Sequence, residues 1–573
     1  DSGYYTPFHA RSIMISMGKK KWRNRPQKNK EEEEVKSLEL QKIEKYMYPA
    51  IITLLVLISY FNAFNNAFVS DDVYGIVNNP AIGQWKNVTS QIFKFFQPLL
   101  YFLIYQIDPT NPTLFRVFNI LVHIGVANLV FILVRKFINP TAAFIAGAIF
   151  AVHPILVESV SWISGGIYSW YTFFFLLSFY YYLAKEKITW RYYLSLFFFW
   201  MALVVGVPAV VLSGVFILYE LSFGNIFKKW LWSIPYFVLS GLYALLTLRG
   251  YGTRVQSLSA TNNSAPEVLN PMIQVPVAIS EYIRLFVWPD SLTLYQSELS
   301  APPMEYTIRL IVFLIVFGVT VYSFFKNKHV FFGLSIFFLG LLPTLTPISI
   351  AWVVAERYAY FSVIGLVYLV GYGLTRLHKR YEALVYGLLV LVIISLSIRT
   401  IVRNNDWDNE DNLWIATVKT SPSDPKSHNN MGDVYARHED LENAARAFEN
   451  AIKLNPGYPD AHHNLGNIYM KQGKTEEAEK LFKRAIELNP ALWQPHQNLG
   501  AIYYNQGMYE KALEENLTVL KMNPNQGSAY LNVGVIYFQL GEKEKARQYF
   551  EIVLSVDPNN QMAQQGIIEL NKL

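Results

Sequence analysis

Long stretches of apolar residues, nearly free of charge, dominate the part of the chain before residue 402. The stretch from Tyr48 to Phe64 is about as long as a helix needs to cross a bilayer, which takes roughly 20 residues at about 1.5 Å each. Lipid cannot satisfy backbone hydrogen-bonding groups, so such stretches fold as helices. We expect about eleven spanning helices, at residues 48–64, 114–136, 141–160, 167–184, 190–206, 208–222, 231–248, 307–325, 330–350, 358–375 and 381–400.

The charges between these stretches predict their orientation. Lys and Arg are retained on the cytoplasmic side of membrane proteins, and residues 19–30 are strongly basic, so we place the N-terminal tail in the cytoplasm. Every second loop is then basic, through Arg135, Lys136, Lys185, Lys187, Lys228, Lys229, Lys326, Lys328, Arg376, Lys379 and Arg380. A crossing at Ile279–Trp288 would invert this pattern, so we expect an interfacial helix there, on the outer surface. The odd number of crossings places the C-terminus outside the cytoplasm.

The composition narrows the class of protein further. Apolar residues make up 52% of the chain and charged residues only 16%, against about 25% charged residues in soluble proteins. The net charge of +6 is too small to suggest nucleic-acid binding. The absence of cysteine excludes disulfide scaffolds, thiolate zinc sites and thiol nucleophiles. We expect an all-α, multi-pass protein in contact with lipid, and its lack of cysteine and compact build favour a bacterial or archaeal plasma membrane.

A 34-residue repeat follows the apolar part of the chain. Glycine recurs at residues 432, 466, 500 and 534, and tyrosine, alanine and proline recur with the same period. This pattern is typical of tetratricopeptide repeats, in which small residues lie where two helices cross and proline ends the second helix. We predict repeats at 425–458, 459–492, 493–526 and 527–560, with flanking helices at Asn409–Ser421 and Gln561–Leu573. The domains are then a cytoplasmic tail (1–47), a membrane domain (48–402) and an extracytoplasmic α-solenoid (403–573).

Asparagine recurs with the same period on the first helix of each repeat, which lines the concave side of such a superhelix. A carboxamide offers both a donor and an acceptor, so it can hold the backbone of any extended polypeptide. Asparagine could instead suit the helix start or the solvated face, but four in phase favour peptide binding. The placement resembles the asparagine ladder of O-GlcNAc transferase. The predicted ladder consists of Asn430, Asn464, Asn498 and Asn532.

Ionisable residues gather at the predicted outer ends of the spans. Asp71 and Asp72 directly follow the first span. Two carboxylates there can deprotonate a hydroxyl or hold a divalent cation such as Mg²⁺ or Mn²⁺, although an acidic pair is more often solvated loop. Ionisable groups within spans are costly to bury and usually functional. The others at the same depth are Arg116, His123, His153, Glu158, Glu356 and Arg357.

These residues also have structural interpretations. His153 beside Pro154 can form a kink with a satisfied imidazole, and Arg116 can extend to lipid headgroups. Glu356 and Arg357 can pair with each other. As a set they suit a lipid-linked phosphate donor, because Arg binds phosphate through two parallel bonds while an aspartate takes a proton from an attacking hydroxyl.

Five segments, in the same order, resemble the transmembrane and tetratricopeptide repeat-containing protein O-mannosyltransferases and their prokaryotic relatives. They are Asp71-Asp72, Phe115–His123, Phe150–Ser164, Val354–Tyr360 and the trailing repeats. The resemblance implies a GT-C glycosyltransferase fold with an outer active site. It also implies a polyprenyl- or dolichyl-phosphate sugar as donor, with mannose or another hexose transferred to Ser or Thr of exported proteins.

The resemblance further implies that Asp71 or Asp72 is the base and that Arg116 and Arg357 hold the departing phosphate. Because they lie at the same predicted depth, we expect His123, His153, Glu158 and Glu356 in the same donor site. The chain departs from the family pattern twice. Gln97 stands where the family has Arg before Pro-Leu, and Gly165-Gly166-Ile167-Tyr168 stands where a Gly-Arg-x-Asp run is common.

Two functions of other classes compete with a glycosyltransferase. In the first, the chain is a membrane-anchored scaffold whose repeats recruit exported proteins, but one span would suffice for an anchor. In the second it is a transporter, for which polar groups near the bilayer middle are expected. The polar residues gather outward instead. We therefore expect a lipid-phosphate-sugar-dependent protein O-glycosyltransferase whose repeats bind the acceptor polypeptide.

Overall fold

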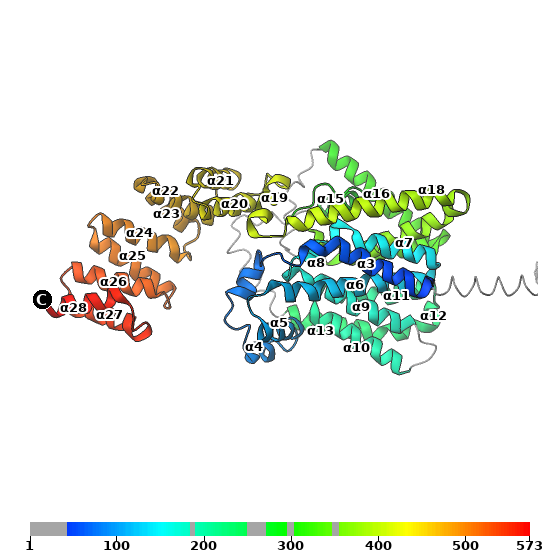
Figure 1. The fold of residues 1–573 in the computed structure, drawn as a ribbon, viewed down its shortest axis with the longest axis horizontal. Helices are drawn as coiled ribbons and strands as arrows, with labels where there is room; N and C mark the ends of the chain where they lie inside the picture. Colours follow the sequence, from blue (N-terminus) through cyan, green and yellow to red (C-terminus); the bar gives the residue numbers. More distant parts are fainter. Residues whose placement is uncertain (1–42, 184–188, 249–270, 295–302, 346–353, 573) are drawn as a thin grey trace, which may run out of the picture.

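The computed structural model describes residues 43–183, 189–248, 271–294, 303–345 and 354–572, and all regular secondary structure in these ranges is helical (Figure 1). A bundle of apolar helices is followed by a solenoid of paired helices. The predicted fold class, an all-α membrane bundle followed by a tetratricopeptide solenoid, is confirmed. Most of the predicted cytoplasmic tail, Lys185, Lys187 and the end of the predicted span 330–350 lie outside the described residues.

The bundle helices vary widely in length. They are α3 (Tyr48–Tyr60), α6 (Pro112–Phe137), α7 (Pro140–Val152), α8 (Glu158–Ser161), α9 (Ile167–Leu183), α10 (Trp190–Val205), α11 (Ser213–Ser222), α12 (Ile226–Lys229), α13 (Ile234–Leu248), α15 (Pro271–Val287), α16 (Pro303–Lys326), α17 (Lys328–Leu341) and α18 (Val363–Asn405). Two further helices, α4 (Trp85–Ser90) and α5 (Phe96–Ile107), lie in the loop after α3. The apolar helix α5 was not predicted.

Each predicted span contains a helix, but not all of these helices are long. Five segments of the described chain are long and apolar enough to cross a membrane, namely Glu44–Ala63, Pro112–Phe137, Trp230–Thr247, Pro303–Lys326 and Ala383–Asn405. The predicted span 141–160 is broken at His153-Pro154, where α7 and the following helical residues meet at 57°. The predicted spans 358–375 and 381–400 are the two arms of α18, which Tyr381 separates with non-helical backbone angles.

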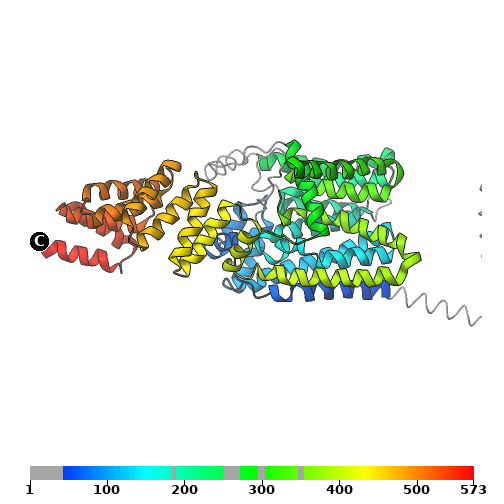
Figure 2. The same cartoon turned by 90° about the horizontal axis from the view of Figure 1, so that it is seen from above.

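The two ends of the bundle differ in what they carry. The solenoid extends from the end where α4, α5 and α8 lie, which we call the solenoid end (Figures 1 and 2). The helix α12 and the kink of α18 lie at the opposite end (Figure 1). Arg135 and Lys136 close α6, which begins near the solenoid end. The acidic doublet lies in the loop between α3 and α4, so it shares the solenoid end with the repeats. The predicted topology requires this arrangement.

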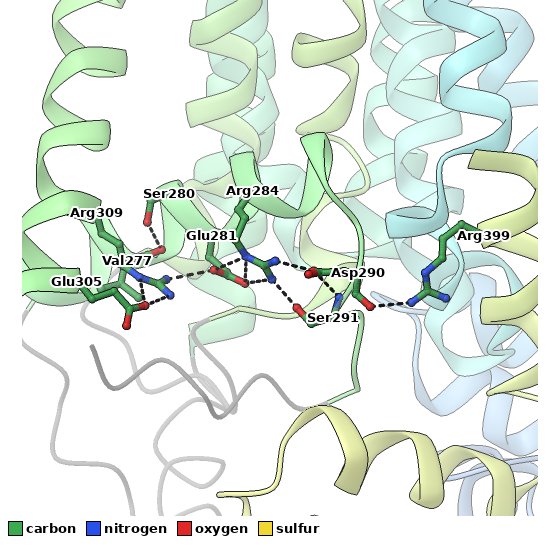
Figure 3. A network of polar contacts seen from close by, with 9 residues as sticks. All are labelled: Val277, Ser280, Glu281, Arg284, Asp290, Ser291, Glu305, Arg309 and Arg399. Carbon is green, nitrogen blue, oxygen red and sulfur yellow. Dashed lines mark hydrogen bonds and ion pairs between the residues drawn. The ribbon is translucent and has the colours of Figure 1, made fainter. Parts of the chain in front are cut away.

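A helix, α15, forms at the stretch predicted to be interfacial and is longer than that stretch, while its position at a membrane surface stays a prediction. A polar network fixes it to its neighbours (Figure 3). Glu281 accepts bonds from Arg284 of the same helix (2.7 Å) and from Arg309 of α16 (3.2 Å). Arg399 of α18 donates to the carbonyl oxygen of Pro289, just after α15, at 3.0 Å. These contacts join α15, α16 and α18 near the solenoid end.

The solenoid has the predicted repeats. Its helices are α19 (Glu410–Thr420), α20 (Pro425–Arg437), α21 (Leu441–Leu454), α22 (Pro459–Lys471), α23 (Thr475–Leu488), α24 (Trp493–Asn505), α25 (Tyr509–Met522), α26 (Gly527–Gln539), α27 (Lys543–Val556) and α28 (Gln561–Lys572). The predicted boundary between residues 402 and 403 falls inside α18. No separate linker follows, because Trp407 and Leu413 belong to the same buried cluster as the bundle core, and Val434 of the first repeat joins them.

The paired helices of each repeat approach closely at the recurring glycine. A Cβ on Gly466 would lie 2.6 Å from the ring of Phe482, and Gly432 and Gly534 lie against phenylalanine rings in the same way. The third repeat differs, because Asn516 occupies the position of the ring against Gly500. The buried Asn516 carboxamide donates to the carbonyl oxygen of Ala512 (2.8 Å).

We expect Phe482→Ala to destabilise the solenoid by about 3–5 kcal/mol, because it leaves a cavity at the helix crossing. Asn516→Ala at the equivalent position should cost only about 1 kcal/mol, because it removes hydrogen bonds of modest net value. Hydrogen–deuterium exchange of α22–α25 in the purified full chain measures both changes. Equal losses for the two variants would contradict this assignment of the repeat core.

Candidate active site

The loop after α3 presents its two aspartates differently. Ser70 has a positive φ of 55°, a left-handed conformation that is uncommon for residues other than glycine. The next residue, Asp71, is exposed, whereas Asp72 is fully buried. One oxygen of Asp72 accepts bonds from the backbone N–H (2.9 Å) and the hydroxyl (2.5 Å) of Ser164, and the other faces the N–H of Val69 at 3.5 Å. Asp72 thus anchors the loop, and Asp71 faces outward.

Burial changes the acid–base behaviour of Asp72. Loss of solvent raises the pKa of the Asp72 carboxyl from 3.8 to about 6. The hydrogen bonds from Ser164 and the positive charge of Arg116 lower that pKa but do not cancel the effect of burial. Keeping Asp72 ionised therefore lowers the free energy of unfolding, and this loss grows as the pH rises toward about 6.

Arg116 supports the same loop from α6. Its guanidinium donates to three backbone carbonyls, those of Asn66, Ala67 (3.0 Å) and Ser161 (2.8 Å). The side chain is fully buried. Through these contacts Arg116 joins the loop after α3 to the residues that follow the break in the third predicted span. Its predicted phosphate-binding role finds no support in them.

The segment 154–166, which follows that break, contacts most of the polar groups at the solenoid end. The carboxamide of Asn119 donates to the carbonyl oxygen of Trp162 (3.2 Å) and accepts from the indole of Trp170 (2.8 Å). A Cβ on Gly166 would lie 2.3 Å from the Asn119 oxygen, so only glycine fits there. The family-divergent Gly166 is therefore a packing requirement of this chain.

The other sequence departures lie beside the same segment. Gln97 donates to the hydroxyl of Tyr101 at 3.2 Å, and that hydroxyl is in turn within hydrogen-bonding reach of Ser164, the partner of Asp72. Tyr168, at the other end of the divergent run, is within hydrogen-bonding reach of Arg357. Both departures thus border the candidate site.

Glu356 and Arg357 do not pair with each other, so that structural interpretation was wrong. Arg357 pairs with Glu158, which also accepts the Arg357 backbone N–H at 2.8 Å. Glu356 pairs with Arg403 at 2.7 Å, and both side chains are buried. The two residues are neighbours in a tight helical turn, so their side chains diverge. The guanidinium of Arg357 lies 4.9 Å from the ring centre of Tyr358. The Arg357 side chain as a whole is 11% exposed.

Both histidines are satisfied by protein groups. His123 is buried between the hydroxyl of Tyr360 (2.7 Å) and the carbonyl oxygen of Ala151 (3.2 Å). His153 accepts from the N–H of Ile155 through Nδ1 and donates through Nε2 to the carbonyl oxygen of Phe286 (2.9 Å). The structural interpretation of His153 as a satisfied kink residue fits these contacts. Donor binding by either histidine stays a prediction.

Sequence reasoning missed the end of α18. The side chain of Asn404 donates to the carbonyl oxygen of Ser59 (2.8 Å) and accepts from the hydroxyl of Ser161 (2.8 Å). The backbone carbonyl oxygen of Asn404 accepts from the carboxamide of Asn66 (3.0 Å). The next turn packs the ring of Trp407 on that of Trp162, with centroids 5.7 Å apart. The signal was available, because polar residues directly after an apolar span resemble those after α3.

The described residues around the doublet give no support to a metal site. Asp72 already uses its oxygens, and in the described ranges no three His, Asp or Glu side chains come together as possible ligands. Mg²⁺ or Mn²⁺ binding by Asp71 and Asp72 stays a prediction.

Two of the four ladder asparagines line a groove on the solenoid. Asn464 and Asn498 border a cavity of about 370 Å³, together with Asp433, Asn467 and Lys471. Asn532 instead donates to the carboxamide of Asn516 at 3.1 Å. Asn430 lies outside the residues that line the cavity.

Comparisons with known proteins agree with this architecture. Tetratricopeptide repeat models match residues 432–473, 459–492, 481–514 and 527–560. Protein O-mannosyl-transferase TMTC3 of Mus musculus is 25% identical over 447 residues, which cover 67% of this chain and 48% of that protein. Protein O-mannosyl-transferase TMTC4 of Homo sapiens is 24% identical over 466 residues, which cover 67% of this chain and 63% of that protein. The family resemblance is confirmed, and the chain spans about half the length of TMTC3.

Solved structures are similar to about a quarter to a third of the chain. The tetratricopeptide protein YrrB, described as having an unusual peptide-binding site, is 22% identical over 35% of this chain and 98% of its own, with a TM-score of 0.25. A MamA protein is 22% identical over 26% of this chain and 81% of its own, with a TM-score of 0.24.

The raised pKa of Asp72 predicts a pH-dependent stability. The folded protein binds a proton at Asp72 more tightly than the unfolded chain does, so stability is lost as pH rises from about 4 to about 6. Asp72→Asn removes this loss. The free energy of unfolding of wild type relative to Asp72→Asn should therefore fall by up to about 3 kcal/mol over that range and then level off.

Thermal unfolding of both proteins in detergent between pH 4 and 8 measures the difference. Asp71→Asn is the matched control, and it should change stability little because the side chain is exposed. If the difference in stability between wild type and Asp72→Asn stays constant with pH, the pKa of Asp72 is not raised by folding.

Proposed function

We propose that this chain, a relative of the transmembrane and tetratricopeptide repeat-containing protein O-mannosyl-transferases, transfers a hexose such as mannose from a polyprenyl- or dolichyl-phosphate carrier to Ser or Thr hydroxyls of exported proteins. The observation that carries the proposal is the shared position of the acidic loop and the solenoid at one end of an apolar bundle. A lipid-linked donor would enter from the bilayer, and a polypeptide acceptor would arrive along the repeats.

Asp71 is the general base in this proposal, and Asp72 is its support. Asp71 is exposed at the turn after Ser70, so a hydroxyl can reach its carboxylate. Asp72 has no exposed surface, and its oxygens already face protein donors. A base needs hydrogen-bonding contact with the proton that it removes, and Asp71 is the better placed of the two.

The reaction then follows from the charges. Asp71 takes the proton of the acceptor hydroxyl, whose oxygen forms a bond to the anomeric carbon of the sugar. The bond from that carbon to the phosphate oxygen breaks, and the lipid phosphate leaves with the electron pair. A phosphate leaving group needs little protonation. Arg357 supplies the positive charge for it, since its side chain is partly exposed and it borders the segment that binds Asp72.

The solenoid binds the acceptor through the groove at Asn464 and Asn498. We place the protein in the plasma membrane as a multi-pass protein, with its N-terminus in the cytoplasm and the solenoid outside. The position of α19 and the first repeat against the bundle core supports delivery of the acceptor to a fixed place.

Separate substitution of the two aspartates tests the mechanism. Asp71→Asn should lower kcat at least about 100-fold, since it removes the base. Asp72→Asn should lower kcat about 10-fold, because asparagine keeps an oxygen for Ser164 but changes how the loop is held. Transfer of mannose from polyprenyl-phosphate mannose to a Ser/Thr peptide by the purified protein measures both.

Donor hydrolysis and peptide binding, measured with the same preparations, are the controls for folding. A larger loss with Asp72→Asn than with Asp71→Asn would assign the base to Asp72. Peptide binding by the wild type without any transfer would favour the scaffold function.

A further inference from the structure

Contacts between repeats decide which hydrogen-bonding groups of Asn464 and Asn498 stay free in the groove of the solenoid. The carboxamide nitrogen of Asn464 donates to the side-chain oxygen of Asn429 (3.1 Å) and faces a carboxylate oxygen of Asp433 (3.4 Å) in the preceding repeat. An ionised carboxylate only accepts hydrogen bonds, so the Asn464 nitrogen must point toward it. The Asn498 nitrogen likewise donates to Asn467 at 2.6 Å. Hydrogen bonds between neighbouring repeats therefore use the carboxamide N–H groups of Asn464 and Asn498.

The acceptors of the same side chains remain available. In the described ranges no protein donor bonds to the carboxamide oxygens of Asn464 and Asn498, or to the second carboxylate oxygen of Asp433. All three residues line the 370 Å³ cavity. A ligand that bonds to these three oxygens must supply hydrogen-bond donors.

The charge of Asp433 adds a second requirement. No ion pair of the described chain includes Asp433, and the nearby Arg437 is already bonded to Glu410 (2.6 Å) and Asp411 (2.8 Å). Burial, and then the like charges of Glu410 and Asp460, raise the pKa of Asp433 to about 6, although Arg437 lowers it. Lys471 lines the groove but is exposed. A cationic group on a ligand would stabilise the ionised carboxylate of Asp433 by pairing with it.

We propose that the groove selects polypeptides that carry a lysine or arginine, with the cation paired to Asp433 and with backbone N–H groups bonded to the carboxamide oxygens of Asn464 and Asn498. The identity of this ligand as the acceptor rests on the proposed function. The selectivity itself does not, because it is a binding property. Asp433 then determines where along a basic-residue-containing peptide the solenoid binds.

Peptide binding to the purified full chain tests the proposal. The probes are fluorescent ten-residue Ser/Thr/Ala peptides with one central Arg, norleucine or Glu. Wild type should bind the Arg peptide about 10-fold more tightly than the norleucine peptide, as expected for one charge-assisted hydrogen bond of roughly 1.4 kcal/mol. Asp433→Asn should remove this preference, and Asp433→Glu should restore part of it.

Asp557→Asn is the matched control, since Asp557 is an exposed acid in the last repeat and should leave the preference unchanged. Asn464→Ala with Asn498→Ala should weaken all three peptides alike. Equal binding of the Arg and norleucine peptides by wild type, a preference for Glu, or the same preference in Asp433→Asn would overturn the proposal, as would no binding at all. Selective binding without sugar transfer would refute the proposed function alone.

Discussion

The buried guanidinium of Arg116 is the contact on which the candidate site depends. A charge inside an apolar bundle is costly unless its donors are satisfied, and here three backbone carbonyls satisfy them. Those carbonyls belong to the loop that carries the acidic doublet and to the segment 154–166. One side chain therefore fixes two chain segments that are far apart in sequence, and the bond from Ser164 to Asp72 follows from that alignment.

The break at His153-Pro154 explains how the segment reaches this position. Proline cannot continue the hydrogen-bonding pattern of α7, and the chain turns by 57°. The turn exposes the carbonyls and side chains of the following residues, which then contact Arg116, Asn119 and Arg357. A straight helix at this place would have directed its backbone groups to itself and left these polar side chains without partners.

Much of the fold could be predicted because its signals are local. Apolar length predicted the bundle helices, and the 34-residue period predicted every solenoid pair. The partners of the site residues could not be predicted, because Ser164 lies 92 residues from Asp72 and Arg403 lies 47 residues from Glu356. Helix α5 was missed because its 12 residues are fewer than a span requires. The ladder was predicted from spacing, but spacing could not show that contacts between repeats use its nitrogens.

The junction between α18 and the first repeat has a consequence for which hydroxyls are accessible. Trp407 is fully buried, and the core runs on into α19 and α20, so the solenoid has no hinge at this point. In the proposed reaction, a chain captured in the groove would stay at a constant distance from the solenoid end of the bundle. Its effective concentration near the acidic loop then depends on how many residues separate the captured point from each hydroxyl. Residue spacing, more than local sequence, would set the pattern of modification along an exported polypeptide.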